Sequence, residues 1–482
     1  MEWSNTRKLK GSAVFTGVIG ENDDGIYLLR FRNKFLSKNV IIERYRHQLG
    51  LMTTKNILLK KSRLLHAELT NNGILLITTH FNRKTMLNEV QSQFFDADIN
   101  AKGDAVTHFT SELVDYYDKG DFRVKMSNDR SKILIYHTEK TRANRRSLHL
   151  NVFTTSMQLI HSKHLEIRID YEEFMLTNSI IDNEGNAFFL VGQRQVVARR
   201  GITVPGSWSI FHYKAKSDSM FDYAVLDSGL QIIGSYFSWD RFQNKINLTA
   251  FYLKQRDPNI EVSENSDLFD ENGIKGLYNF EFWIDGNHPP KSNYVKFTPN
   301  FVEDLLGDKL GLGSDGIKNF KIIETIPNSD GGITLIAERS SFLMEQDITY
   351  VNGLPQTMSR NMYNFDDVLV LSLDSEYDVK WKHVINKSQS SLNDGGYYSS
   401  ITIANTRSNL YILYNDRLRT NGDVIQYAFS PEGEVSNKIL IRSDANYVSI
   451  IPSEAKQIGY NTLLLPVSKD NKFSMLKLVY PN

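Results

Sequence analysis

The residues of this sequence best suited to hold a metal ion are two histidines close together in the chain, His161 and His164. Imidazole nitrogens are common ligands of zinc and other transition metals. The residues on both sides of the pair, Leu159 and Leu165 among them, have the apolar character of a strand. An offset of three residues in a strand places two side chains on opposite faces. We therefore expect no metal site at this pair.

Pairs of acidic residues are a second feature with possible chemistry, because glycoside hydrolysis uses two carboxyl groups at a defined separation. Such pairs stand at Asp23–Asp24 and Asp366–Asp367, but a chain with 56 acidic residues contains pairs by chance. The sequence has no cysteine, nucleophile elbow, phosphate-binding loop, zinc-protease motif or dinucleotide fingerprint. We therefore expect a protein that is not an enzyme and that has no cofactor and no metal.

Arginines form one compact basic group, which consists of Arg142, Arg145 and Arg146. Two interpretations stay open for it. The group is either a solvated hairpin tip or a patch that binds an anionic partner, because guanidinium groups form paired hydrogen bonds with carboxylates and phosphates.

Aromatic residues are concentrated in two segments, and we treat both as candidate partner-binding positions. These residues are Tyr236, Trp239, Phe242, Tyr278, Phe280 and Trp283. Exposed aromatic side chains on the loops of a rigid fold commonly anchor a binding partner. The same residues fit the core of a sheet, because their spacing does not distinguish a buried face from an exposed patch.

The elements that must position these residues are short apolar strands, each led by a turn rich in Asp, Asn, Ser and Gly. Copies of this pattern begin at Gly25, Gly73, Ser131, Asn186, Gly229, Gly332, Ser408 and Tyr460. Another apolar stretch precedes most copies, which predicts a hairpin, and a third strand follows in most units. Units of about 50 residues with four antiparallel strands are typical of β-propeller blades. We predict an all-β fold, a β-propeller with eight four-stranded blades, and seven blades as the alternative.

The two ends of the chain predict how this propeller closes. The last unit contains three strands, near residues 447–452, 462–467 and 474–480, and lacks a fourth. Residues Trp3 to Lys10 are a spare strand length at the other end. We expect this N-terminal segment to complete the last blade and to close the ring.

One interval interrupts the repeat. The spacing between Gly229 and Gly332 is about twice the usual one, which predicts an excursion at about residues 256–318 in or after the fifth blade of a single domain, residues 1–482. Inside it, Asn300 and Glu303 have the spacing of a helix capping box. The excursion either completes a blade with long connections or projects as a partner surface, since insertions in repeat folds commonly cluster on the binding face.

One unit carries a motif with a family resemblance. The pattern Asp182-x-x-Gly185-Asn186-x-Phe188-x-x-Val191-Gly192 resembles the repeat core of degenerate propellers in secreted and cell-envelope proteins of Gram-negative bacteria. This resemblance implies a propeller that is usually non-catalytic and often part of a larger assembly. It also implies an extracytoplasmic location, either periplasmic, associated with the outer membrane or secreted. The start at Met1 fits a mature secreted domain whose leader has been replaced, and it fits a cytoplasmic protein equally.

Composition excludes other classes of partner. Lys+Arg and Asp+Glu both number 56 and the formal net charge is 0, so no global field attracts nucleic acid. No stretch approaches the roughly 20 apolar residues of a membrane span.

We expect a rigid protein–protein interaction platform, a subunit of an envelope assembly such as a secretion complex. The alternative is a glycan-binding or glycan-cleaving propeller with its site at the mouth of the central channel.

Overall fold

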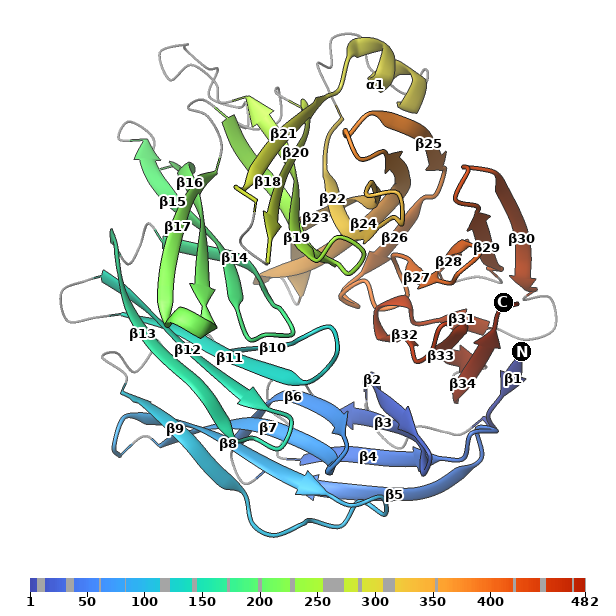
Figure 1. Ribbon diagram of the computed structural model, residues 1–482. Coiled ribbons are helices and arrows are strands. Elements are labelled where there is room, and N and C mark those ends of the chain that lie inside the picture. Colours follow the sequence, from blue (N-terminus) through green and yellow to red (C-terminus); the bar gives the residue numbers. More distant parts are fainter. Residues whose placement is uncertain are drawn as a thin grey trace. The chain divides into compact units, whose positions relative to one another are not determined.

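The protein is an eight-bladed β-propeller. The computed structural model describes residues 1–6, 14–31, 39–59, 62–82, 84–112, 122–140, 145–170, 174–197, 202–225, 230–254, 273–284, 288–306, 317–351, 354–418, 422–442, 448–469 and 472–481. These residues form eight antiparallel sheets, each with a path of four strands (Figure 1). The chain divides into two compact units, residues 1–111, 340–367 and 386–482 in the first and residues 112–339 and 368–385 in the second.

The first unit contains four of the sheets. Their strands are β2 (Val14–Asn22), β3 (Gly25–Phe31), β4 (Asn39–Tyr45) and β5 (Leu51–Leu58); β6 (Ser62–Thr70), β7 (Gly73–Asn82), β8 (Leu87–Phe95) and β9 (Val106–Glu112); β27 (Thr402–Asn405), β28 (Leu410–Asn415), β29 (Val424–Phe429) and β30 (Val435–Ile441); and β31 (Val448–Ile450), β33 (Thr462–Lys469), β34 (Lys472–Val479) and β1 (Glu2–Trp3), with β32 (Lys456–Gln457) paired to β33. A short 3-10 helix, Pro452–Glu454, follows β31.

The second unit contains three sheets. Their strands are β10 (Arg123–Met126), β11 (Lys132–Lys140), β12 (Arg145–Thr154) and β13 (Leu159–Asp170); β14 (Phe174–Ile181), β15 (Ala187–Val197), β16 (Ile202–Lys214) and β17 (Ser219–Val225); and β18 (Leu230–Asp240), β19 (Lys245–Lys254), β20 (Gly276–Trp283) and β21 (Lys291–Lys296). A 3-10 helix, Ala215–Ser217, lies between β16 and β17, and helix α1 (Pro299–Leu306) follows β21.

The eighth sheet is built from β22 (Phe320–Pro327), β23 (Ile333–Val351), β24 (Leu354–Leu373) and β25 (Val379–Ile385), and β26 (Gln389–Leu392) also pairs with β24. β23 and β24 contain 19 and 20 residues and are the longest of the described strands. The part of this hairpin from Ser340 to Asp367 belongs to the first unit, and we call it the arm.

Position within a blade explains the composition of its strands. The second strands, such as β3 and β28, are buried at nearly every residue, because apolar side chains of adjacent blades cover both of their faces. The fourth strands, such as β5 and β30, are largely exposed. The continuous apolar run of a second strand is therefore the repeat that the sequence displays most clearly.

The fifth copy of the predicted repeat is out of phase with the others. Gly229 directly precedes β18, the first strand of its blade, whereas the equivalent second strand is β19, which begins at Lys245. Residues 276–283 and 291–296 of the predicted excursion are the third and fourth strands of that blade. Of the two interpretations, the one in which these residues complete a blade agrees with the structure.

The predicted helix exists, but it begins earlier than the capping box indicates. α1 starts at Pro299, and the N–H of Phe301 donates to Oγ1 of Thr298 at 3.2 Å. Thr298, rather than Asn300, therefore caps the first turn.

The N-terminal strand pairs with the last strand, as predicted. Glu2 and Trp3 of β1 lie opposite Lys477 and Leu476 of β34, and the two chain ends lie side by side in Figure 1. The contact continues at Ser4, which is buried and whose N–H donates to the carbonyl of Met475 at 2.9 Å. Residues 7–10 of the predicted segment lie outside the described residues.

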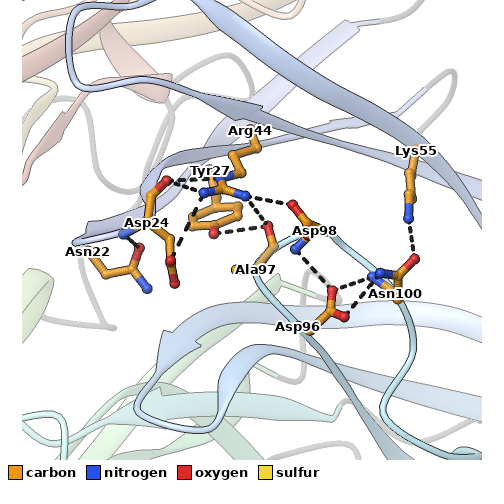
Figure 2. A network of polar contacts seen from close by, with 9 residues as sticks. All are labelled: Asn22, Asp24, Tyr27, Arg44, Lys55, Asp96, Ala97, Asp98 and Asn100. Carbon is orange, nitrogen blue, oxygen red and sulfur yellow. Dashed lines mark hydrogen bonds and ion pairs between the residues drawn. The ribbon is translucent and has the colours of Figure 1, made fainter.

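Adjacent blades are joined by polar contacts at their turns, and Figure 2 shows one such contact in the first unit. Arg44, on β4, donates to the carbonyl of Asp24 at 2.7 Å and to the carboxylate of Asp98 at 2.7 Å. Tyr27 donates to the carbonyl of Ala97 at 3.1 Å. Asp24 belongs to the β2–β3 turn and Asp98 to the turn after β8, so this network ties the first blade to the second.

Candidate functional site

Two of the predicted partner-binding aromatics lie in the core of a blade. Tyr278 and Phe280 on β20 are 1% and 7% exposed, and they pack in the cluster between the β14–β17 and β18–β21 sheets. They cannot contact a partner without unfolding that blade, which corrects the prediction for these two residues. Their positions on a third strand, covered on that face by the neighbouring sheet, explain the burial.

Three more of these aromatics are partly buried. Tyr236 packs against the core next to β22, and burial together with the nearby Glu324 raises its pKa to about 12. Trp239 packs against the cluster on the other face of β18. Trp283 lies 5.3 Å from the His288 ring, with the Lys245 ammonium 5.8 Å from its ring centre. These side chains point in different directions and do not form one surface.

Phe242 is the member of the set that is exposed. It lies in the β18–β19 turn with 52% of its surface accessible, and the Arg241 guanidinium is 5.1 Å from its ring centre. One exposed aromatic in a turn is common on protein surfaces and does not make a site.

The structure covers the arginine group only in part. Arg142 and the side chain of Arg145 lie outside the described residues. Arg146 is half-buried on β12, with its guanidinium 6.0 Å from the ring centre of Phe174 and 3.5 Å from the hydroxyl of Thr138. The guanidinium of Arg146 therefore lies near the Phe174 ring and the Thr138 hydroxyl.

The acidic pairs do not converge into a pair of catalytic carboxyls. Asp24 is part of the polar network of Figure 2. Asp366 and Asp367 are consecutive on β24, so their side chains leave opposite faces of the strand. Asp366 accepts a hydrogen bond from Ser388 at 3.2 Å, and Asp367 is buried.

A surface that the sequence analysis did not identify lies on the arm. Three consecutive apolar residues of β23, Phe342, Leu343 and Met344, are 51%, 50% and 60% exposed. Phe342 and Met344 leave one face of the strand and Leu343 leaves the other. The Phe342 ring lies 5.1 Å from the ring of Tyr363 on β24. The sequence signal is the run Phe-Leu-Met, which does not alternate between apolar and polar residues as a half-buried strand does. Polar residues flank this run, Glu338–Ser341 before it and Glu345–Asp347 after it.

Hydrogen bonds fix the base of the arm to its own unit. Met362 to Phe365 of β24 pair with β26. Lys387 donates to the carbonyl of Phe365 at 2.9 Å and to the side chain of Gln389 at 3.1 Å. Gln389 in turn donates to the carbonyl of Asn415 at 2.6 Å. The apolar residues are therefore presented by a strand pair whose root is held by hydrogen bonds.

The strand pairing on one side of β23, with β22, ends where the arm begins. β22 pairs with β23 only as far as the register pair Phe320 and Arg339, because β22 begins at Phe320. From Ser340 onward this side of β23 lies beyond the end of β22, next to the exposed side chains. An edge of this kind can accept an additional strand.

A cluster of side chains of the types that bind metal ions lies away from the arm, on the sheet of β10 to β13. It contains His137, Glu139 and His149, whose ligand atoms all lie within 4.8 Å of one another. His164 is near this cluster, opposite His149, whereas His161 is opposite Val152 and faces the other side of β13 toward Tyr213. The predicted placement of His161 and His164 on opposite faces of a strand agrees with the structure, but the sequence analysis missed His137 and His149. Their pairing follows from the register between strands, which spacing along the chain does not reveal.

The comparisons with known proteins identify no family for this chain. No protein-family model and no curated protein matches the chain. Among solved structures, it is similar to the WD40 domain of SCAP from fission yeast, with 7% identity, a TM-score of 0.42, and coverage of 99% of this chain and 98% of that one. It is also similar to the β-propeller domain of the Trilobed protease from Pyrococcus furiosus, with 10% identity, a TM-score of 0.35, and coverage of 92% and 96%.

An apocarotenoid oxygenase from Synechocystis is similar at 8% identity, with a TM-score of 0.36 and coverage of 100% of this chain and 94% of that one. At these identities and TM-scores the similarities carry no conclusion about the function of this chain. Within the described part of the chain, none of the helices has the length and apolar character that a membrane crossing requires.

Proposed function

We propose that this propeller is a non-catalytic platform that binds another protein through its arm. The observation that carries the proposal is the exposure of Phe342, Leu343 and Met344 on a strand pair whose base is held by hydrogen bonds. Full burial of one such side chain contributes about 1.5–3 kcal/mol. A rigid root reduces the conformational entropy that association would otherwise cost.

The partner that fits this surface is a protein that adds a strand next to β23. Beyond Arg339 the backbone of β23 has passed the end of β22, so a partner strand can continue the sheet there. Side chains alternate along that edge, so Phe342 and Met344 would enter pockets on one side and Leu343 would lie on the other.

Site-specific photo-crosslinking tests the proposal. A photoreactive amino acid replaces Leu343 in one variant and Leu159, an exposed residue at the start of β13, in a control variant. Both are expressed in the native host. We expect one dominant crosslinked partner from position 343 and none from position 159. The substitutions Phe342→Ser, Leu343→Ser and Met344→Ser together should abolish co-purification of that partner while the circular dichroism spectrum stays unchanged. If the triple variant retains the partner in full, the arm is not the binding surface.

The location of the protein is a separate part of the proposal. The resemblance of the Asp182–Gly192 segment to envelope propellers supports an extracytoplasmic site of action within a larger assembly. Fractionation of the native host, with detection of the protein in cytoplasmic, periplasmic and membrane fractions, tests this directly. Recovery in the cytoplasm alone would remove the envelope role and leave the arm hypothesis intact.

A further inference from the structure

Three histidine rings form a row across the β10–β13 sheet. His137 on β11, His149 on β12 and His164 on β13 are direct neighbours in the register of the three strands. Their rings are stacked, with centres 4.6 Å apart for His137 and His149 and 4.0 Å apart for His149 and His164. The ring of Phe122 stacks on the other side of His137 at 4.4 Å. The register of the sheet therefore fixes the spacing of the imidazoles.

A carboxylate lies next to two of these rings. Glu139 is two residues after His137 on β11, so both side chains leave the same face. Its Oε1 is 2.7 Å from Nε2 of His149, and its Oε2 is 3.6 Å from Nε2 of His137. Glu139 thus reaches both imidazoles with different oxygens.

The burial of the group is graded. His137 is 1% exposed and lies deepest, whereas Glu139 and His149 are about one fifth to one quarter exposed. His164, next in the row, is exposed. The group therefore has a buried floor and a side that opens to solvent, through which an ion can enter.

We propose that His137, Glu139 and His149 bind a divalent transition-metal ion of the Zn²⁺ class, with the fourth coordination position open to solvent. Two imidazole nitrogens and one carboxylate oxygen are a common ligand set for zinc sites that keep an open position. Imidazole ligands favour zinc, copper, nickel and iron over calcium and magnesium, which prefer oxygen. The hydroxyl of Ser147 lies 3.2 Å from Nε2 of His149 and must give up this contact when that nitrogen binds the ion.

Binding requires a small rearrangement of the rings. The planes of His137 and His149 differ by 11°, so their nitrogen lone pairs lie in two nearly parallel planes that do not meet at one ion. Ligand atoms around a tetrahedral zinc ion lie about 3.3 Å apart, given zinc–ligand distances of about 2.0–2.1 Å. The widest separation in the group is at most 4.8 Å. Rotation about the Cβ–Cγ bond of each histidine, a torsion with a broad minimum, brings the nitrogens together.

Titration of the chelator-treated full-length protein with ZnCl₂ in a calorimeter tests the proposal. We expect one ion per chain for the wild type, and an affinity lower by about tenfold or more in His149→Gln and in Glu139→Gln. The matched control is His161→Gln, which changes a histidine of the same sheet on its opposite face and should leave the affinity unchanged. His137 is not used because its replacement in the core can prevent folding.

Absorption of the Co²⁺-substituted protein gives an independent readout. Co²⁺ in this site should show the visible bands of a four-coordinate ion with nitrogen and oxygen ligands, and His149→Gln should remove them. The proposal is overturned if the wild type binds no Zn²⁺ at micromolar concentration. It is equally overturned if His149→Gln and His161→Gln bind Zn²⁺ as tightly as the wild type.

Discussion

His212, which is buried, and Glu324, which is half-buried, have pKa values that move in opposite directions. His212 on β16 is stacked on Phe188 at 4.3 Å and contacts the edge of Phe282 at 4.5 Å. Burial among these rings disfavours the charged imidazole and lowers its pKa to about 4. Burial of the Glu324 carboxyl on β22 disfavours its charged form and raises its pKa to about 7. Each residue therefore makes the stability of the fold depend on pH.

The substitution His212→Phe should make the protein more tolerant of acid. Between pH 6.5 and about pH 4 the unfolded chain binds a proton at His212 that the folded chain does not, so wild-type stability falls as the pH falls. The full effect is about 3 kcal/mol. Thermal unfolding at pH 7.5 and pH 5 measures it: the midpoint of the variant should fall less than that of the wild type. Equal falls in the two proteins would show that His212 is protonated in the fold.

The substitution Glu324→Gln should act at the other end of the pH range. Between pH 4.5 and about pH 7 the folded chain keeps a proton that the unfolded chain releases, so wild-type stability falls as the pH rises through this window. The amide cannot ionise, and the variant should lose less stability than the wild type between pH 5 and pH 8. The comparison uses thermal midpoints at those two pH values. A larger loss in the variant would mean that the native carboxylate is ionised and stabilised by a neighbour.

The turns between third and fourth strands share one backbone feature, a residue in the left-handed region. Six such turns lie wholly within the described residues. In four of them the residue in the left-handed backbone region is a large apolar one, namely Leu49, Ile99, Met157 and Tyr377, whereas the other two have Asp218 and Gly433. The four apolar side chains are buried. In each turn the left-handed residue donates its N–H to the carbonyl three residues earlier. The blade therefore uses a strained residue to place a side chain in the core.

Substitutions at Ile99 separate backbone strain from packing. Ile99 has φ 64° and is buried, so its removal costs core packing, about 2–5 kcal/mol for a change to alanine. Glycine loses the same packing but adopts this backbone conformation without the cost of about 1–2 kcal/mol that other residues have. We expect thermal stability in the order Ile99, Ile99→Gly, Ile99→Ala. An alanine variant more stable than the glycine variant would show that the left-handed conformation costs little here.

Elements with a strong local pattern were predictable from the sequence, and elements defined by pairing were not. The second strands have continuous apolar runs, so seven of the eight predicted copies begin within two residues of the start of such a strand. The prediction of a second strand at Gly229 was wrong, because Leu230–Asp240 is as apolar as a second strand although it is the first strand of its blade. The arm was missed because strand length depends on the partner strand. The histidine row was missed because residues 137, 149 and 164 meet only through the register.

At the scale of the whole molecule, the two ends of the chain share one sheet. β34 pairs with β33 on one side and with β1 on the other, so it would be an edge strand without the first residues of the chain. Strands of one blade are otherwise consecutive in sequence, and this blade alone among the described ones joins residues more than 450 positions apart. Its integrity therefore depends on a contact that forms only when both ends of the chain are present.

Deletion of residues 1–6 should destabilise the protein and expose β34. The loss includes the β1–β34 pairing and the bonds of Ser4, whose Oγ accepts from the N–H of Met475 at 2.8 Å and whose carbonyl accepts from Ser474 at 3.0 Å. Each such bond contributes about 0.5–1.5 kcal/mol, and an open edge promotes association between molecules.

We expect a thermal midpoint lower by several degrees, faster amide exchange at Met475 and Lys477, and aggregation on storage. The matched control is Glu2→Ser, which changes an exposed side chain and keeps the backbone pairing. Ser4→Ala should fall between the two, because it removes only the hydroxyl while the N–H bond to the Met475 carbonyl remains. A deletion variant with wild-type midpoint, exchange rates and monodispersity would show that the last blade is stable with three strands.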